Sequence, residues 1–302
     1  MKKLKNPPKW TTPLLGSVLL LILLFVAVQP QKMAVVNAHE SIEGAAELEV
    51  LKNTMAKLGI EHTVLQGIPK GLLYFTDGVA NLSEVEENNA LLAEAVRENP
   101  EQFSYFCTID PNDPLRLETL EACNEASGVK LYNGYSYAHT VPLDDYKLNT
   151  FYARLTELEL PLMLPVSTNE YEAELRNMLT LNPELTVICP HFCLSSKNLP
   201  RLRALMEDFP NLYIDTSFGH IDFAQEGFKT LLENKEAYRA FFEEFQDRIV
   251  FGTDAVLSSY EGKDEEWVTD LYKDYLSTLR DLDLTPSVQR KILSGNWNSL
   301  TR

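Results

Sequence analysis

The feature that most limits the possible folds of this chain is an alternation of short apolar runs with amphipathic stretches, which begins near residue 33. Apolar runs without a regular polar face are typical of parallel strands that are covered on both sides. Eight such runs separated by helical patterns, in about 270 residues, predict a closed (β/α)₈ barrel. We predict strands at residues 33–39, 62–66, 103–109, 128–132, 160–166, 185–191, 212–215 and 247–254.

A doubly wound open sheet is the alternative α/β fold for this alternation. That fold usually carries a glycine-rich phosphate-binding loop after its first strand. The corresponding stretch here reads Asn-Ala-His-Glu-Ser at residues 37–41 and contains no glycine. We therefore expect one TIM barrel domain at residues 33–302, preceded by a hydrophobic anchor helix within residues 1–32.

The N-terminus has the composition of a membrane anchor. Four lysines within the first nine residues precede an uncharged apolar stretch at residues 14–28. No convincing small-x-small cleavage site follows it. We predict an uncleaved signal anchor, a transmembrane segment whose lysines stay in the cytoplasm. The barrel would then lie on the extracytoplasmic side, periplasmic or extracellular. A cleaved signal peptide is the alternative.

The charge distribution excludes one class of partner. Residues 1–32 hold five of the 27 basic residues and no acid, so the barrel has 22 basic residues against 44 acidic ones. Binding to nucleic acid needs a basic face. We therefore expect no nucleic-acid partner, and we expect a small-molecule substrate instead.

The four cysteines do not specify a pairing. Cys107 and Cys189 lie in apolar strand-like runs, where a free, buried thiol is the expectation. The spacing between Cys189 and Cys193, without a second pair, is a weak metal signal. We assign no disulfide.

Four polar residues lie near the C-terminal ends of predicted strands: His39, Lys130, His191 and Asp254. Side chains at these ends converge on the mouth of a barrel. Taken singly, each has a simpler structural role, such as a hydrogen-bonded histidine or an aspartate that caps the next segment. Together, in a chain with five histidines, they favour a site that could bind zinc or act as acid and base.

Several short motifs occur in an order and spacing that resemble the amidohydrolase superfamily, in its amidohydrolase-related (amidohydrolase 2) branch of metal-dependent hydrolases and decarboxylases. The resemblance extends from about residue 33 to the C-terminus. The motifs lie at residues 128–131, 157–162, 182–191, 211–217, 251–254 and 292–296.

The resemblance implies a metal site. In the family a His-x-His on strand one, a histidine on strand five and the aspartate on strand eight hold the metal, and the strand-six histidine contacts metal, water or substrate. Matched by position, His39, His191 and Asp254 would hold a divalent metal, with zinc as the first expectation. Ser41 replaces the second strand-one histidine and Pro165 the strand-five histidine, and Asn37 stands where the family commonly has aspartate.

Replacement ligands could come from Glu40, His139, His220 or Cys193, and the sequence does not choose among them.

Three functions remain open at this point. The first is hydrolysis of a small polar molecule, or decarboxylation, with a metal-activated water and with Asp254, His191 and Lys130 as catalytic residues. The second is acid–base catalysis by the same three residues without metal. The third is a non-catalytic, membrane-tethered binding module, in which the aromatic loop at residues 132–137 either stacks on a ring or packs as a rim over the mouth.

Overall fold

The computed structural model describes residues 33–73, 82–219, 221–258 and 263–301. The predicted anchor within residues 1–32, and His220, lie outside these ranges. Among the described residues, we find no helix that is both long enough and apolar enough to cross a bilayer. Residues 34–302 form one compact unit.

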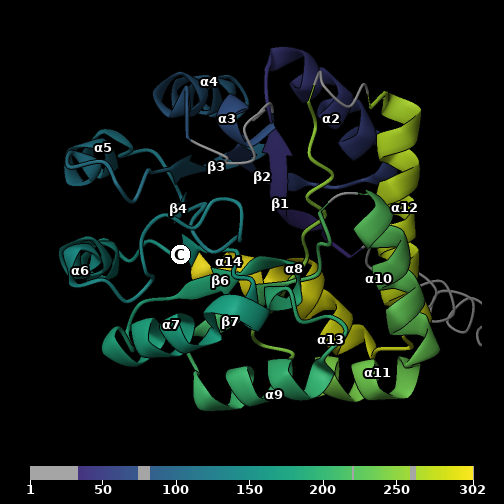
Figure 1. Ribbon diagram of the computed structural model, residues 1–302. Helices are drawn as coiled ribbons and strands as arrows, with labels where there is room; N and C mark the ends of the chain where they lie inside the picture. The colour runs from purple at the N-terminus through teal and green to yellow at the C-terminus, as the bar shows by residue number, and fades with distance from the viewer. Residues whose placement is uncertain (1–32, 74–81, 220, 259–262, 302) are drawn as a thin grey trace, which may run out of the picture. The chain divides into compact units, whose positions relative to one another are not determined.

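Eight parallel strands follow one another around the sheet in chain order (Figure 1). They are β1 (Val36–Ile42), β2 (His62–Gly67), β3 (Phe103–Thr108), β4 (Gly128–Lys130), β5 (Leu162–Met163), β6 (Val187–Cys189), β7 (Leu212–Asp215) and β8 (Ile249–Val250).

Backbone hydrogen bonds from Ala38 N to Phe251 O, and from Leu257 N to Ser41 O, both 2.7 Å long, join β1 to the segment around and after β8. The predicted (β/α)₈ barrel is confirmed, and the open sheet is excluded.

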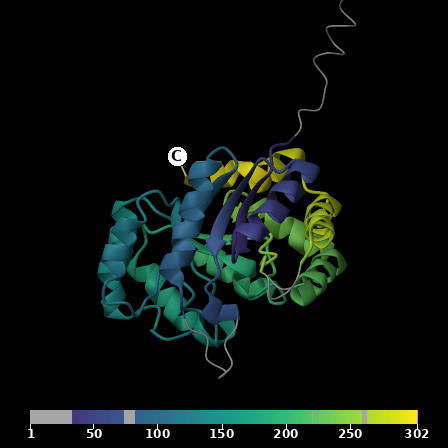
Figure 2. The ribbon, with the colours of Figure 1, turned by 90° about the horizontal axis from the view of Figure 1, so that it is seen from above.

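Helices surround the strands (Figures 1 and 2). They are α2 (Ala45–Leu58), α3 (Lys70–Leu73), α4 (Val85–Glu98), α5 (Arg116–Ala122), η1 (Tyr146–Leu148), α6 (Asn149–Glu157), α7 (Thr168–Leu181), α8 (Pro190–Cys193), α9 (Leu199–Asp208), α10 (Ile221–Glu233), α11 (Lys235–Glu244), α12 (Glu265–Asp281), α13 (Pro286–Arg290), η2 (Lys291–Gly295) and α14 (Asn296–Leu300). The apolar positions of α2 repeat at helical spacing, and Gly59 ends that helix in the left-handed conformation with φ of 70°.

The strand β1 extends three residues beyond its predicted end at His39. Its pairing with β2 is irregular between Asn37 and Glu40. An irregularity of this kind re-aims side chains and is common beside active sites. Here it coincides with the change from Ala38, which belongs to the apolar core, to His39, which belongs to a polar cluster.

The core between the strands is apolar and includes the C-terminal helix. Trp297 of α14 packs with its ring centroid 5.7 Å from that of Phe106 on β3. Asn296 Nδ2 donates to the carbonyl oxygens of Gln246 and Ile249, which attaches α14 to β8. The remaining members of this cluster are Val36, Ala38, Val64, Met163, Ile188 and Val250.

We predict that Phe106→Ala lowers the free energy of unfolding by about 3–5 kcal/mol, because it leaves a cavity in a fully buried part of the core. Leu181→Ala, at a side chain that is 62% exposed, should change it by less than about 0.5 kcal/mol. Urea unfolding of both variants measures the difference. Similar stabilities of the two variants would contradict this description of the core.

Candidate functional site

A buried carboxylate and imidazole form the base of the site. His39 Nδ1 lies 2.6 Å from Asp215 Oδ2, and both side chains are fully buried. A carboxylate only accepts, so Nδ1 carries the proton and Nε2 presents its lone pair. Asp215 ends β7, and the field and hydrogen bond of His39 hold its pKa far below the ordinary value against the opposing effect of burial.

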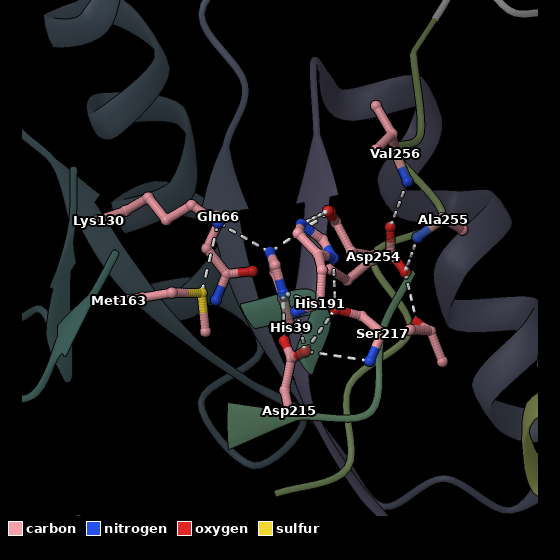
Figure 3. Close-up of polar contacts among 12 residues, drawn as sticks. His39, Gln66, Lys130, Met163, His191, Asp215, Ser217, Asp254, Ala255 and Val256 are labelled. Carbon is pink, nitrogen blue, oxygen red and sulfur yellow. Dashed lines mark hydrogen bonds and ion pairs between the residues drawn. The ribbon is translucent and has the colours of Figure 1, made fainter. Parts of the chain in front are cut away.

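Lys130 approaches His39 from β4. Its Nζ lies 2.9 Å from His39 Nε2 and 3.4 Å from Met163 Sδ (Figure 3). Burial lowers the pKa of Lys130 to about 8. Lys130 is therefore not a charge on the exposed rim of the barrel, because its ammonium is buried against an imidazole.

His191 does not end a strand as predicted. The strand β6 stops at Cys189, and His191, Phe192, Cys193 and Leu194 all have positive φ values between 47° and 59°. A left-handed backbone costs about 1–2 kcal/mol for each residue that is not glycine. A run of four such residues must be held by other contacts, and strain of this kind is concentrated at functional sites.

Two contacts hold this turn. Cys189 and Cys193 form a disulfide across it, and His191 N donates to Asp215 Oδ1 at 2.8 Å. Cys107 and Cys123 form a second disulfide. The expectation of free thiols at Cys107 and Cys189 is therefore wrong: an apolar run predicts a buried sulfur, but not the partner that the fold brings to it.

The His191 ring also has a defined orientation. Ser217 Oγ donates to Asp215 Oδ1 at 2.6 Å and accepts from His191 Nδ1 at 2.9 Å. Nε2 then accepts from the Tyr135 hydroxyl at 2.9 Å. Burial lowers the pKa of His191 to about 4. The imidazole is therefore neutral near pH 7, and its Nε2 lone pair faces the mouth.

Asp254 completes the group from the segment after β8. Its Oδ1 lies 3.5 Å from His39 Nε2, and its Oδ2 lies 3.4 Å from His191 Nε2. Burial disfavours its charge, but electrostatic interactions with His39, His191 and Lys130 outweigh burial and lower its pKa. Oδ1 is buried and accepts no hydrogen bond within the described part of the chain.

Glu40 supports the segment that carries Asp254. Its two oxygens accept from the backbone N–H groups of Ala255 and Val256 and from the hydroxyls of Thr253 and Tyr272. Asp254 itself has a φ of 43°, an uncommon value for a residue with a side chain. Burial, and then the field of Asp254, raise the pKa of Glu40 to about 7.

The structure thus brings together all four residues that the sequence singled out (Figure 3). It also adds Asp215, Ser217 and Tyr135. Asp215 could have been found by the same rule as the others, because it is the last residue of a predicted strand.

The suggested replacement ligands have other partners. Glu40 supports the segment after β8, Cys193 is in a disulfide, and His139 lies next to Asn133 O and Glu174. Asn37, at the position of the family aspartate, binds Thr253 and Tyr272.

His39, His191 and Asp215 form a buried group whose possible ligand atoms lie close enough together to hold a metal ion. The oxygens of Asp215, however, are already hydrogen-bonded to His39, His191 N and Ser217. Asp254 is a second candidate for the carboxylate ligand, since metal bonds of about 2.0–2.2 Å at tetrahedral angles place neighbouring ligand atoms about 3.4 Å apart. One of its oxygens lies 3.5 Å from His39 Nε2, and the other lies 3.4 Å from His191 Nε2.

A cavity of about 390 Å³ opens above His191 and Asp254. It is lined by Ser41, Ile68, Leu72, Tyr132, Tyr135, Tyr137, Ser167, His191, Leu194, Phe218, Gly219, Phe223, Asp254 and Val256. Ser41 therefore lies at the site although it cannot replace the histidine as a ligand. The cavity is large enough to hold a small molecule in contact with the polar group.

Comparison with known proteins gives a family match and structural likenesses. The model of a family described as amidohydrolase matches residues 43–296. No curated protein matches the chain.

Among solved structures, 5-carboxyvanillate decarboxylase from Sphingomonas paucimobilis is 13% identical, with 90% of this chain and 99% of that chain covered and a TM-score of 0.62. A probable 2-pyrone-4,6-dicarboxylic acid hydrolase from Acinetobacter baumannii, with citric acid bound, is 16% identical, with coverage of 89% and 99% and a TM-score of 0.62. An amidohydrolase from Burkholderia multivorans with bound zinc is 13% identical, with coverage of 89% and 99% and a TM-score of 0.61.

We predict that Cys189→Ser with Cys193→Ser weakens zinc binding at least about tenfold, because the left-handed turn is then free to relax and to move His191. Cys107→Ser with Cys123→Ser is the matched control. Its disulfide spans 16 residues, so its loss should lower stability by about 3 kcal/mol without changing zinc affinity. Calorimetric zinc titration and urea unfolding measure the two effects. Equal zinc affinity in both variants would contradict the role of the turn.

We also predict opposing pH dependences in the metal-free protein. The raised pKa of Glu40 contributes stability that is complete below about pH 4.5 and is lost as the pH rises through about 7. The lowered pKa of His191 contributes stability that is present above about pH 6.5 and is lost as the pH falls through about 4. Each is on the order of 3 kcal/mol across its window.

Relative to the unsubstituted chain, His191→Gln should therefore gain stability when the pH is lowered from 7 to 5, and Glu40→Gln should lose it. Urea unfolding at the two pH values measures both variants. Parallel pH profiles for the two would show that these groups do not titrate as described.

Proposed function

The chain belongs to the amidohydrolase family, and from this premise we propose that it is a hydrolase that cleaves a small molecule with a metal-activated water. The family supports a hydrolase-like enzyme with a small-molecule substrate. The observation that carries the finer proposal is the ionised Asp254 carboxylate, which has one unsatisfied buried oxygen and whose two oxygens lie 3.5 Å from His39 Nε2 and 3.4 Å from His191 Nε2.

Each residue of the site would have its own role in this reaction. His39 Nε2, His191 Nε2 and Asp254 would hold the metal, which supplies a water of lowered pKa and polarises the bond to be cleaved. Asp215 fixes the orientation of both rings through Nδ1 of His39 and through Ser217. Asp254 would accept the proton of the attacking water.

Negative charge that develops on the substrate oxygen during hydrolysis needs a hydrogen-bond donor to stabilise it. The Tyr135 hydroxyl, which points at His191 Nε2, and the Lys130 ammonium are the donors nearest to the centre. His191, neutral near pH 7 because burial lowers its pKa to about 4, is not a proton donor in its resting state.

A second candidate is acid–base catalysis without metal. The observation in its favour is the hydrogen bond between Lys130 Nζ and His39 Nε2, which already uses the lone pair that a metal would need. A lysine whose pKa is lowered to about 8 can also exchange protons close to neutral pH. Sensitivity of the activity to chelators separates the two candidates.

We also propose that the barrel lies outside the cytoplasm, anchored by residues 1–32. Two disulfides support this proposal, because disulfides persist mainly in oxidising compartments. Cell fractionation combined with labelling of an N-terminal tag would test the location and orientation of the anchor.

We predict about one zinc-class ion for each full-length chain purified without chelator, and hydrolysis of dihydrocoumarin or a related lactone or ester in a substrate screen. His39→Ala should lose the metal, and Asp254→Asn should lower kcat/KM by at least about 10²-fold. His62→Ala, at a histidine bonded to Ser104 on the neighbouring strand, and Asp208→Asn are the matched controls.

Elemental analysis and initial rates measure these outcomes. Activity that survives both site substitutions would contradict the proposed function. Activity that depends on Asp254 and Lys130 but persists in excess chelator would favour the metal-independent candidate.

A further inference from the structure

We propose that the part of the substrate that does not react is a ring that carries no negative charge. This inference rests on the proposed function, because it names what occupies the cavity above the metal-binding residues. It comes from the walls of that cavity, of which the catalytic assignments use the Tyr135 hydroxyl, His191 and Asp254 but no aromatic face.

The walls are aromatic and fixed in place. The rings of Tyr135 and Tyr137 stack with centroids 5.0 Å apart and planes 10° from parallel. Tyr132 is anchored by a hydrogen bond from its hydroxyl to Gly67 O. Phe218 stacks on the buried ring of Phe192 at 5.2 Å. Rigid aromatic surfaces favour a flat apolar partner, since stacking adds to the burial of apolar area.

The cavity offers no counter-charge for an anion. Its described lining contains neither lysine nor arginine, and its one charged side chain is Asp254.

The nearby cations have other partners. Lys130 lies beneath the cavity against His39. Lys197 and Arg201 line an adjoining hollow, where they pair with Glu226 at 2.8 Å and with Glu172 at 3.3 Å. A carboxylate on the ring would therefore lose its hydration without gaining a cationic partner in the described lining.

The test compares two probes of equal size: benzamide and benzoate. Their binding to the full-length protein is measured by ligand-observed NMR in excess chelator, so that no carboxylate–metal contact contributes. We expect the dissociation constant of benzamide to be at least about tenfold lower than that of benzoate. Benzoate binding as tightly as benzamide would overturn the proposal.

A gain of function provides the second arm. Leu72→Arg places a guanidinium on the cavity wall, and it should strengthen benzoate binding at least about tenfold while changing benzamide binding little. Leu181→Arg, on an exposed position of α7, is the matched control and should change neither. Failure of Leu72→Arg to improve benzoate binding would show that the probes bind elsewhere and would also overturn the proposal.

These measurements involve no turnover, so they separate this inference from the proposed function. A preference for benzamide in a chain that hydrolyses nothing would leave the ring site standing and remove the hydrolase. Hydrolysis that depends on Asp254, together with equal binding of both probes, would do the reverse.

Discussion

The carboxylate of Asp215 is the interaction on which the rest of the site depends. One oxygen bonds to His39 on β1, and the other accepts from His191 N and from Ser217. Three segments that are far apart in the chain are thereby fixed to a single charged group in a fully buried position. A buried carboxylate without these donors would be costly. With them, it sets the tautomer of both imidazoles and turns both Nε2 atoms toward Asp254.

The backbone is unusual at His191 and at Asp254, and contacts with other segments hold it in place at both positions. The left-handed turn at residues 191–194 is closed by the Cys189–Cys193 disulfide. The segment of Asp254, whose φ is also positive, is held by Glu40 through the N–H groups of Ala255 and Val256. Strained backbone persists only where its surroundings over-determine it. The polar network of the barrel mouth thus stabilises conformations that the local sequence would not adopt by itself.

The departures from the family pattern remove two of the metal ligands that the resemblance implies. Ser41 lines the cavity in place of the second strand-one histidine, and Pro165 occupies the strand-five position. Lys130 Nζ meanwhile forms a hydrogen bond with His39 Nε2, the ring nitrogen that does not contact Asp215. Three protein ligands and an open position are common in catalytic zinc sites. In the proposed function, the aromatic walls of the cavity would position the substrate.

The sequence by itself determined the barrel and the positions of its strands. Runs apolar on both faces allow few architectures, so eight of them with helices between were sufficient. The same rule placed His39, Lys130, His191 and Asp254 at one mouth. It did not predict a role for Asp215, because the role of a carboxylate at a strand end depends on which side chains β1 and the turn after β6 place beside it. Nor did it pair the cysteines or predict the left-handed turn. Those features are contacts between segments distant in the chain or backbone states held by such contacts, and only the tertiary structure decided them.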